Sequence, residues 1–169
     1  MTKPFVAILM GSDTDFPVVE EAVKILKKFQ IPLEVKVTSA HRTPTQTQAY
    51  VQEADQRGCA VFVAAAGMAA HLAGTVAALT IKPVIGIPID AGPLQGFDAL
   101  LSTAQMPGGI PVATVAIGRA GAKNAGYLAA QILALNDAGI ALKLKQEREA
   151  NAVEIQQKNV TLQKQLPAS

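Results

Sequence analysis

The hydrophobic pattern of the chain switches repeatedly between short apolar runs and helical periods. Four runs are predominantly apolar, at Phe5–Met10, Ala60–Ala66, Pro83–Ile89 and Pro111–Ile117. Unalternated runs of this length are typical of strands covered on both faces, as in a parallel sheet. A fifth segment, Pro32–Val37, alternates apolar with polar residues and therefore predicts a strand at the edge of the sheet.

Segments with helical spacing separate these strands. In the first of them Val19, Val23 and Leu26 lie on one helical line, with Pro17 in the first turn. The pattern predicts helices over about residues 16–30, 43–57, 69–80, 97–105 and 120–135. After Gly139 the chain runs for 27 residues without Gly or Pro, which predicts a long polar helix, either solvated or packed over a neighbouring subunit.

Five strands that alternate with helices predict an α/β fold with a doubly wound parallel sheet. We expect a flavodoxin-like three-layer sandwich with strand order 2-1-3-4-5 and a long C-terminal helix. The length fits one catalytic domain over residues 1–169, with a core at 4–136 and a helical tail at 137–169.

Charged residues are sparse and unevenly placed. They make up 17% of the chain, against roughly 25% in a typical soluble domain. The sixty residues from Cys59 to Gly118 carry only Lys82, Asp90 and Asp98. A small domain leaves much of its chain exposed, so an uncharged stretch of this length predicts burial against sister subunits in a homo-oligomer.

Composition also weighs against several classes of protein. The net charge of +2 and the few scattered aromatic residues do not resemble a nucleic-acid binder. The single Cys59 excludes an internal disulfide and fits a reducing cytoplasm. The stretch Cys59–Ile81 has no charge over 23 residues, but Gly67, His71 and Gly74 interrupt it, so we expect a buried strand and helix rather than a membrane span.

Polar side chains follow the first three predicted strands. The segments are GSDTD at Gly11–Asp15, SAHRTP at Ser39–Pro44 and GMAAHLAG at Gly67–Gly74, and they contain both histidines of the chain. In an open parallel sheet, ligands bind beyond the carboxyl ends of the strands, near the point where strand order reverses. We therefore expect the three loops to form one site.

The first two loops carry groups suited to a phosphorylated sugar. Ser12 and the backbone N–H groups at a helix start can bind an anion, and Asp15 can accept from two adjacent hydroxyls. Arg42 can bind a phosphate bidentately, with Ser39 and Thr43 donating hydroxyls beside it. The alternatives are that these side chains only cap helices, and that Arg42 forms a surface ion pair.

The two histidines suggest proton transfer. The imidazole of His41 suits acid–base chemistry, whereas His71 at a helix start is expected to act as a neutral hydrogen-bonding group. Either could instead be a structural imidazole. A metal site would need both histidines and an aspartate, and neither histidine has a partner at i+3 or i+4. The residues therefore suggest acid–base chemistry on a phosphorylated sugar, with no cofactor and no metal.

Five motifs in order carry a resemblance to a known family. They are MGSDTD, SAHRTP, AGMAAHLAG, QMPGGIPVATVAIG and GAKNAGYLAAQIL, which together span about residues 6–135. With these motifs the chain resembles the N5-carboxyaminoimidazole ribonucleotide mutase family of purine biosynthesis, the catalytic subunit of phosphoribosylaminoimidazole carboxylase. The tail after Leu135 resembles the family mainly in being helical.

The resemblance implies a reaction and a set of roles. Family members are flavodoxin-like octamers that move a carboxylate from the N5 amine to C4 of an aminoimidazole ribonucleotide without ATP, metal or biotin. A separate ATP-dependent enzyme supplies the carbamate. By position, the resemblance assigns phosphate binding to Ser12, Ser39 and Arg42, ribose binding to Asp15, acid–base catalysis to His41, and the substrate pocket to Ala40, Gly67, Ala70, His71 and Leu72. The loop Gln105–Pro111 is expected to close the site, in one arrangement from a neighbouring subunit.

The chain also departs from the family pattern. The third loop often reads GGAAHLPG, whereas this chain has Met68 and Ala73 at two of those positions. We expect the backbone at the Met68 turn to matter more than its side chain. Two alternative functions remain open: a carboxylase that uses CO2 directly, whose branch lacks the AAHL pattern, and a non-catalytic nucleotide-sensing domain of the same fold.

Overall fold

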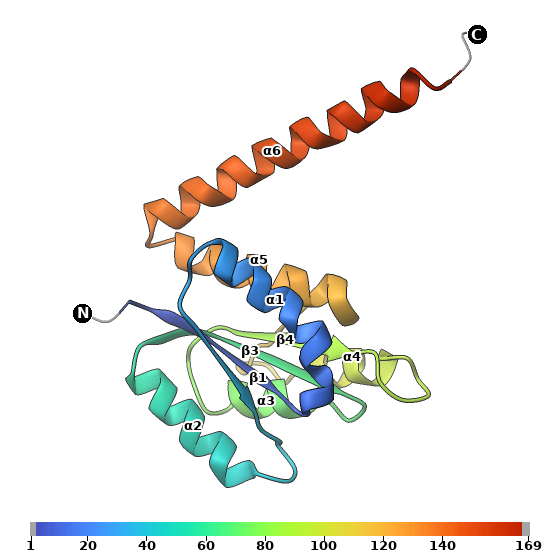
Figure 1. The fold of residues 1–169 in the computed structure, drawn as a ribbon. Helices are drawn as coiled ribbons and strands as arrows, with labels where there is room; N and C mark the ends of the chain where they lie inside the picture. The colour runs from blue at the N-terminus through green and yellow to red at the C-terminus, as the bar shows by residue number, and fades with distance from the viewer. Residues whose placement is uncertain (1–2, 167–169) are drawn as a thin grey trace.

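The chain folds into a parallel sheet with helices on both faces (Figure 1). The computed structural model describes residues 3–166. The strands are β1 (Phe5–Met10), β2 (Leu33–Val37), β3 (Cys59–Gly67), β4 (Val84–Ile89) and β5 (Ala113–Thr114). Their order is β2-β1-β3-β4-β5, and all neighbours are parallel. The predicted flavodoxin-like three-layer sandwich and its strand order are confirmed.

The helices divide between the two faces of the sheet. They are η1 (Asp13–Asp15), α1 (Phe16–Lys28), α2 (Pro44–Gln56), α3 (Leu72–Ala77), α4 (Phe97–Ala104), α5 (Gly118–Ala134) and α6 (Ala138–Gln163). Helices α1 and α5 cover one face, and α2 and α3 cover the other (Figure 1). In β1, Val6 and Ile8 face the first pair while Ala7 and Leu9 face the second, so the whole strand is buried. Burial on both faces explains the unalternated apolar run.

Two elements are shorter than predicted. Strand β5 has two residues instead of the seven in Pro111–Ile117, because the chain turns into α5 and the Ala116 carbonyl packs against Gly121. Helix α3 begins at Leu72 rather than near 69, because Met68 has a left-handed φ of 54° and tight turns follow it. Neither difference changes the topology.

An ion pair joins the edge strand β2 to helix α2. Glu34 on β2 accepts hydrogen bonds from Arg57 Nη2, just beyond α2, and from the Tyr50 hydroxyl, both at 2.9 Å. Arg57 holds the pKa of Glu34 down at about 2, while burial and the Glu34 carboxylate raise the pKa of Tyr50. These contacts connect the two elements on either side of the loop at residues 38–43, so they help to set its span.

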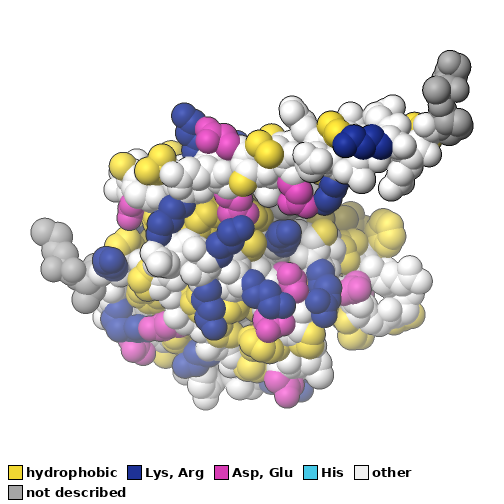
Figure 2. Space-filling model, turned by 45° about the horizontal axis from the view of Figure 1, so that its top comes forward, with side chains coloured by type: hydrophobic (Ala, Val, Ile, Leu, Met, Phe, Trp, Pro, Cys, Tyr) yellow, Lys and Arg dark blue, Asp and Glu magenta, His cyan; other side chains and the backbone are white. Residues whose placement is uncertain are grey.

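The C-terminal helix is long and polar, as predicted. Asp137 caps it by accepting the Gly139 and Ile140 N–H groups, and its first half is tied to the body through Glu147, which bonds Lys28 and Tyr127. The distal half extends past the body (Figure 1), and no residue of α6 is buried in the chain. Figure 2 shows positive and negative side chains interspersed over α6 and the surface beside it.

The uncharged central stretch forms interior elements and apolar surface. Cys59 is buried at the start of β3, and the stretch from it to Ile81 contains β3 and α3 rather than one long helix. Within residues 3–166 no helix has the length and apolar character needed to cross a bilayer. Large apolar side chains remain exposed in this region, notably Ile81 at 99%, Phe97 at 63% and Leu101 at 58%.

We expect Glu34→Gln to destabilise the fold in a pH-dependent way. The folded-state pKa of Glu34 lies below its ordinary value of 4.5, so its charge stabilises the folded state above that value. The contribution is lost as pH falls from about 4.5 towards 2, and it is modest because the pair is partly exposed. Urea unfolding of both proteins should show a gap at pH 7 that shrinks by pH 3. An equal gap at both pH values would contradict the role of this charge.

Candidate functional site

The loops that follow β1, β2 and β3 meet at one edge of the sheet and enclose a cavity of about 250 Å³. Its lining residues are Gly11, Ser12, Thr14, Asp15, Ser39, Ala40, His41, Arg42, Ala66, Gly67, Met68, Ala69, His71, Leu72 and Ala91. The structure therefore brings together nine of the eleven residues singled out from the sequence. One exception is Thr43, whose hydroxyl bonds the Ser39 backbone instead of facing the cavity. The other is Ala70, which is buried beside the cavity and donates its N–H to Ser102 Oγ at 3.2 Å.

The first loop is both a helix cap and a wall of the cavity. Ser12 Oγ accepts the Thr14 N–H at 3.3 Å, and Asp15 Oδ2 accepts the Ser12 N–H at 3.2 Å. Both side chains therefore cap the helix, as one of the alternatives predicted, and both also line the cavity. Asp15 is only 8% exposed, and burial raises the pKa of its carboxyl group.

The second loop is closed by its own serine. Ser39 Oγ accepts the N–H groups of His41 and Arg42 at 3.3 and 3.1 Å, and the Ser39 carbonyl accepts the Thr43 N–H at 3.0 Å. The hydrogen of the Ser39 hydroxyl stays available for a ligand. Within residues 3–166 no ion pair joins Arg42 to a carboxylate, so the alternative of a surface pair is not realised there.

The third loop depends on one close approach of backbone. A Cβ on Gly67 would lie 2.8 Å from the Cβ of Ala91, so only glycine lets the ends of β3 and β4 come together here. The next residue, Met68, adopts the left-handed φ that usually favours glycine, and its side chain lies over Gly92 at the cavity rim. Both the backbone turn and the Met68 side chain therefore contribute to the cavity rim.

The two histidines of the chain face each other in the cavity. His41 Nε2 lies 2.7 Å from His71 Nδ1, with the rings nearly perpendicular at 83°. A hydrogen bond of this length holds a single hydrogen between the two nitrogens, so one ring donates and the other accepts. His41 Nδ1 and His71 Nε2 are the nitrogens left to exchange a proton with a ligand. The pair can therefore hold or pass on one proton.

The sequence reasoning missed several wall residues. Ala91 follows β4, and the rule that selected the first three loops would have found it if applied to the fourth strand. Ala66 and Ala69 are small apolar residues with no chemical signal of their own. Thr14 belongs to the first loop, and its side-chain hydroxyl donates to Ser12 Oγ at 2.8 Å beside the cavity.

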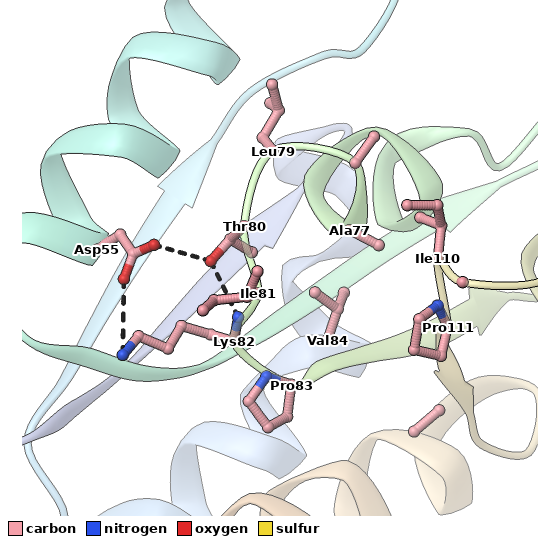
Figure 3. A pocket seen from close by; sticks show the side chains of 13 residues that line it. Asp55, Ala77, Leu79, Thr80, Ile81, Lys82, Pro83, Val84, Ile110 and Pro111 are labelled. Atoms are coloured by element: carbon pink, nitrogen blue, oxygen red, sulfur yellow. Dashed lines mark hydrogen bonds and ion pairs between the residues drawn. The ribbon is translucent and has the colours of Figure 1, made fainter.

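The loop Gln105–Pro111, which was expected to close the site, lies away from this cavity. No residue of Gln105–Pro111 lines the cavity formed by residues 3–166. Gly109, Ile110 and Pro111 instead line a larger cavity, of about 810 Å³, near the amino end of β4 (Figure 3).

The larger cavity offers little chemistry. Its polar side chains are bonded to one another: Thr80 donates to Asp55 at 2.9 Å, and Lys82 Nζ lies 3.8 Å from the same carboxylate. The rest of the wall is mostly apolar (Figure 3). The smaller cavity therefore remains the candidate site.

The groups in the smaller cavity define the class of ligand. Hydroxyls, backbone N–H groups and one guanidinium suit a phosphate, a buried carboxylate suits ribose hydroxyls, and the imidazole pair suits proton transfer. Among residues 3–166 no three His, Cys, Asp or Glu side chains are grouped as metal ligands. The fold and the site define a flavodoxin-like protein whose cavity carries groups suited to a phosphorylated sugar or nucleotide beside a pair of imidazoles.

Comparison with known proteins agrees with this class. The AIRC family model, described as AIR carboxylase, matches residues 5–154. An N5-carboxyaminoimidazole ribonucleotide mutase from Synechocystis is 50% identical over 96% of this chain and 91% of that relative, and one from Pyrococcus abyssi is 54% identical over 86% and 83%. The crystal structure of PurE from Treponema denticola is 32% identical, covers 95% of this chain and 99% of its own, and has a TM-score of 0.86. The chain belongs to the AIR carboxylase family.

We expect Asp15→Asn to stabilise the protein at neutral pH while weakening ligand binding. The raised folded-state pKa means that the buried charge costs stability above that value, and the cost disappears below the ordinary value of 3.8, where both states are protonated. Loss of a charged hydrogen-bond acceptor should lower the affinity for ribose 5-phosphate roughly 10- to 100-fold. Urea unfolding at pH 7 and pH 3.5 and calorimetric titration measure the two effects. A variant less stable than the parent at pH 7 would contradict the assignment.

Proposed function

We propose that this protein is an N5-carboxyaminoimidazole ribonucleotide mutase, which converts its substrate into 4-carboxyaminoimidazole ribonucleotide in de novo purine biosynthesis. The observation that carries the proposal is the imidazole pair, His41 and His71, beside a loop that presents Arg42 and Ser39. Relatives about 50% identical over most of the chain are named as this mutase, which supports the same activity here.

The proposed binding mode uses each wall of the cavity. The 5′-phosphate is bound by Ser12, Ser39 and Arg42. Among residues 3–166 the Ser39 hydroxyl hydrogen and the Arg42 guanidinium have no carboxylate partner, whereas Ser12 Oγ donates to Asp13 Oδ1 at 3.2 Å and turns from it to reach the phosphate. Asp15 accepts the ribose hydroxyls, because its carboxylate borders the cavity and only one oxygen is used by Ser12. The apolar wall around the imidazole ring and the carboxylate of the substrate consists of Ala40, Gly67 and Leu72, with Ala70 lying directly behind them.

The proposed reaction is a decarboxylation followed by a recarboxylation. The bond between N5 and the carboxylate carbon breaks, its electron pair stays on nitrogen, and N5 takes a proton from His41 as CO2 is released. C4 of the electron-rich ring then attacks the CO2, and His41 removes the C4 proton, which restores aromaticity. His41 donates one proton to N5 and recovers one from C4, so the reaction is balanced without a cofactor.

His71 has a supporting role in this cycle. At 2.7 Å from His41 it can accept or return the hydrogen between the rings as His41 changes its protonation. The small apolar residues of the third loop exclude water, which matters because escaped CO2 would leave free aminoimidazole ribonucleotide.

The proposal extends to assembly and context. The exposed apolar side chains of the uncharged central stretch, such as Ile81 and Phe97, support a homo-octamer in which neighbours cover them. In that assembly the loop Gln105–Pro111 of one subunit closes the site of another, and α6 packs over a neighbour. The chain then acts as a single catalytic domain in the cytoplasm, downstream of an ATP-dependent enzyme that makes the carbamate.

The decisive assay compares two substrates. Purified protein should convert N5-carboxyaminoimidazole ribonucleotide rapidly at low bicarbonate, with the C4-carboxylated product followed by its absorbance. Activity only with aminoimidazole ribonucleotide at high CO2 would make it a direct carboxylase instead. Tight binding of either nucleotide without turnover would favour the nucleotide-sensing alternative.

We expect His41→Asn to abolish most turnover while keeping ligand binding. The variant loses the proton donor and acceptor, and general acid–base catalysis is worth roughly 100- to 10,000-fold in rate. Steady-state kinetics and calorimetric titration with the product measure the two effects separately. The matched comparison is Arg42→Ala, which should mainly weaken nucleotide binding. Near-normal turnover in His41→Asn would remove this residue from the mechanism.

A further inference from the structure

Two buried threonines lie directly beside the loop that carries His41 and Arg42. Thr38 is 5% exposed and directly follows β2, and Thr47 is fully buried in the first turns of α2. Both positions lie in the interior, where a valine of nearly the same shape would avoid burying a hydroxyl. The two hydroxyls must therefore be explained by the groups to which they hydrogen-bond.

The threonine hydroxyls form a continuous chain with the loop backbone. Thr38 Oγ1 lies 2.6 Å from Thr47 Oγ1 and 3.3 Å from Thr43 Oγ1. Thr47 Oγ1 donates to the Thr43 carbonyl at 3.0 Å, and Thr43 Oγ1 accepts the Ser39 N–H at 2.9 Å. Thr43 Oγ1 also lies 3.2 Å from the Ser39 carbonyl oxygen, to which it donates. Both ends of the segment 39–43 are thus held by hydroxyls.

The directions of these hydroxyl bonds are linked. Each hydroxyl has a single hydrogen, and the Ser39 and Thr43 carbonyls can only accept, so Thr43 and Thr47 are the donors in their contacts with these carbonyls. With those hydrogens so placed, Thr38 is the donor in its short contact with Thr47, where either oxygen could donate.

The helix itself does not need these hydroxyls. The Thr47 N–H already donates to the Thr43 carbonyl at 3.0 Å, which satisfies the first helical turn. The additional bonds act instead on residues 39–43, whose N–H groups from His41 and Arg42 converge on Ser39 Oγ. A loop anchored in this way presents the imidazole and the guanidinium in one arrangement.

We propose that Thr47, supported by Thr38, is a positioning residue that holds the loop bearing His41 and Arg42 in its reactive geometry. Thr47 is absent from the cavity wall and acts only through Thr43 and Ser39. The proposal rests on the proposed mutase function for its kinetic test. Small displacements of a catalytic group lower rates strongly, by up to about 100-fold for 1 Å.

The test compares two substitutions that separate the hydroxyl from the methyl group. Thr47→Val keeps the shape and loses the hydroxyl, so kcat should fall about 10- to 100-fold. Its stability should fall as well, because the buried Thr38 hydroxyl loses its partner. Thr47→Ser keeps the hydroxyl and leaves a small void, so it should also be less stable than the parent and yet turn over close to the parent rate. Activity should therefore separate the two variants although both lose stability.

Two further variants serve as controls. Thr103→Val replaces another threonine that is 2% exposed, on α4, and should leave kcat and KM within about twofold, as expected for an isosteric change remote from the site. The double variant Thr38→Val with Thr47→Val removes both facing hydroxyls, so no buried donor is left unpaired and stability should recover if the single valine variant folds poorly. Its kcat should remain low.

Hydrogen exchange of the His41 and Arg42 amides gives a readout independent of activity. Exchange should accelerate in Thr47→Val and not in Thr47→Ser. Parental kcat and exchange in Thr47→Val, or equal impairment of the valine and serine variants, would overturn the positioning role. Absence of mutase activity in the parent protein would instead overturn the proposed function, and the exchange experiment would still decide the role of Thr47.

Discussion

The site depends on burial of the parallel sheet on both faces. Because α1 and α5 cover one face and α2 and α3 the other, the central strands β1, β3 and β4 have no solvated face on which to place chemistry. Polar groups can gather only where strands end, and the parallel order β2-β1-β3 brings three such ends to one edge. At the amino end of β4, by contrast, the polar groups of the larger cavity bond only to each other.

At that edge, hydrogen bonds made by serine and threonine hydroxyls hold the loops in place. Ser12 and Ser39 each organise their own loop, and the threonines beneath the second loop anchor it to α2. The ion pair of Glu34 with Arg57 holds the strand and the helix on either side of that loop. Rigid elements and local capping thus place an imidazole and a guanidinium side by side without burying either of them.

Chemistry and assembly are linked through exposed apolar surface. The described chain leaves large side chains such as Ile81 and Phe97 in solvent, and α6 extends past the body with no buried residue. The cavity also lacks any contribution from the loop at 105–111. In the proposed octamer, neighbouring subunits would cover this surface and complete the site, so assembly would bear on catalysis as well as on stability.

By itself, the sequence determined the strand order, the edge position of β2 and the three loops of the site, because apolar periodicity and the edge rule depend on local pattern. It overestimated β5 and α3, since the packing of Gly121 against Ala116 and the left-handed turn at Met68 are tertiary effects. Only the tertiary structure decided that His41 and His71, thirty residues apart, share a hydrogen bond, and that the hydroxyls of Thr38 and Thr47 meet between β2 and α2. Contacts between loops depend on how distant backbones meet, and no local pattern encodes that distance.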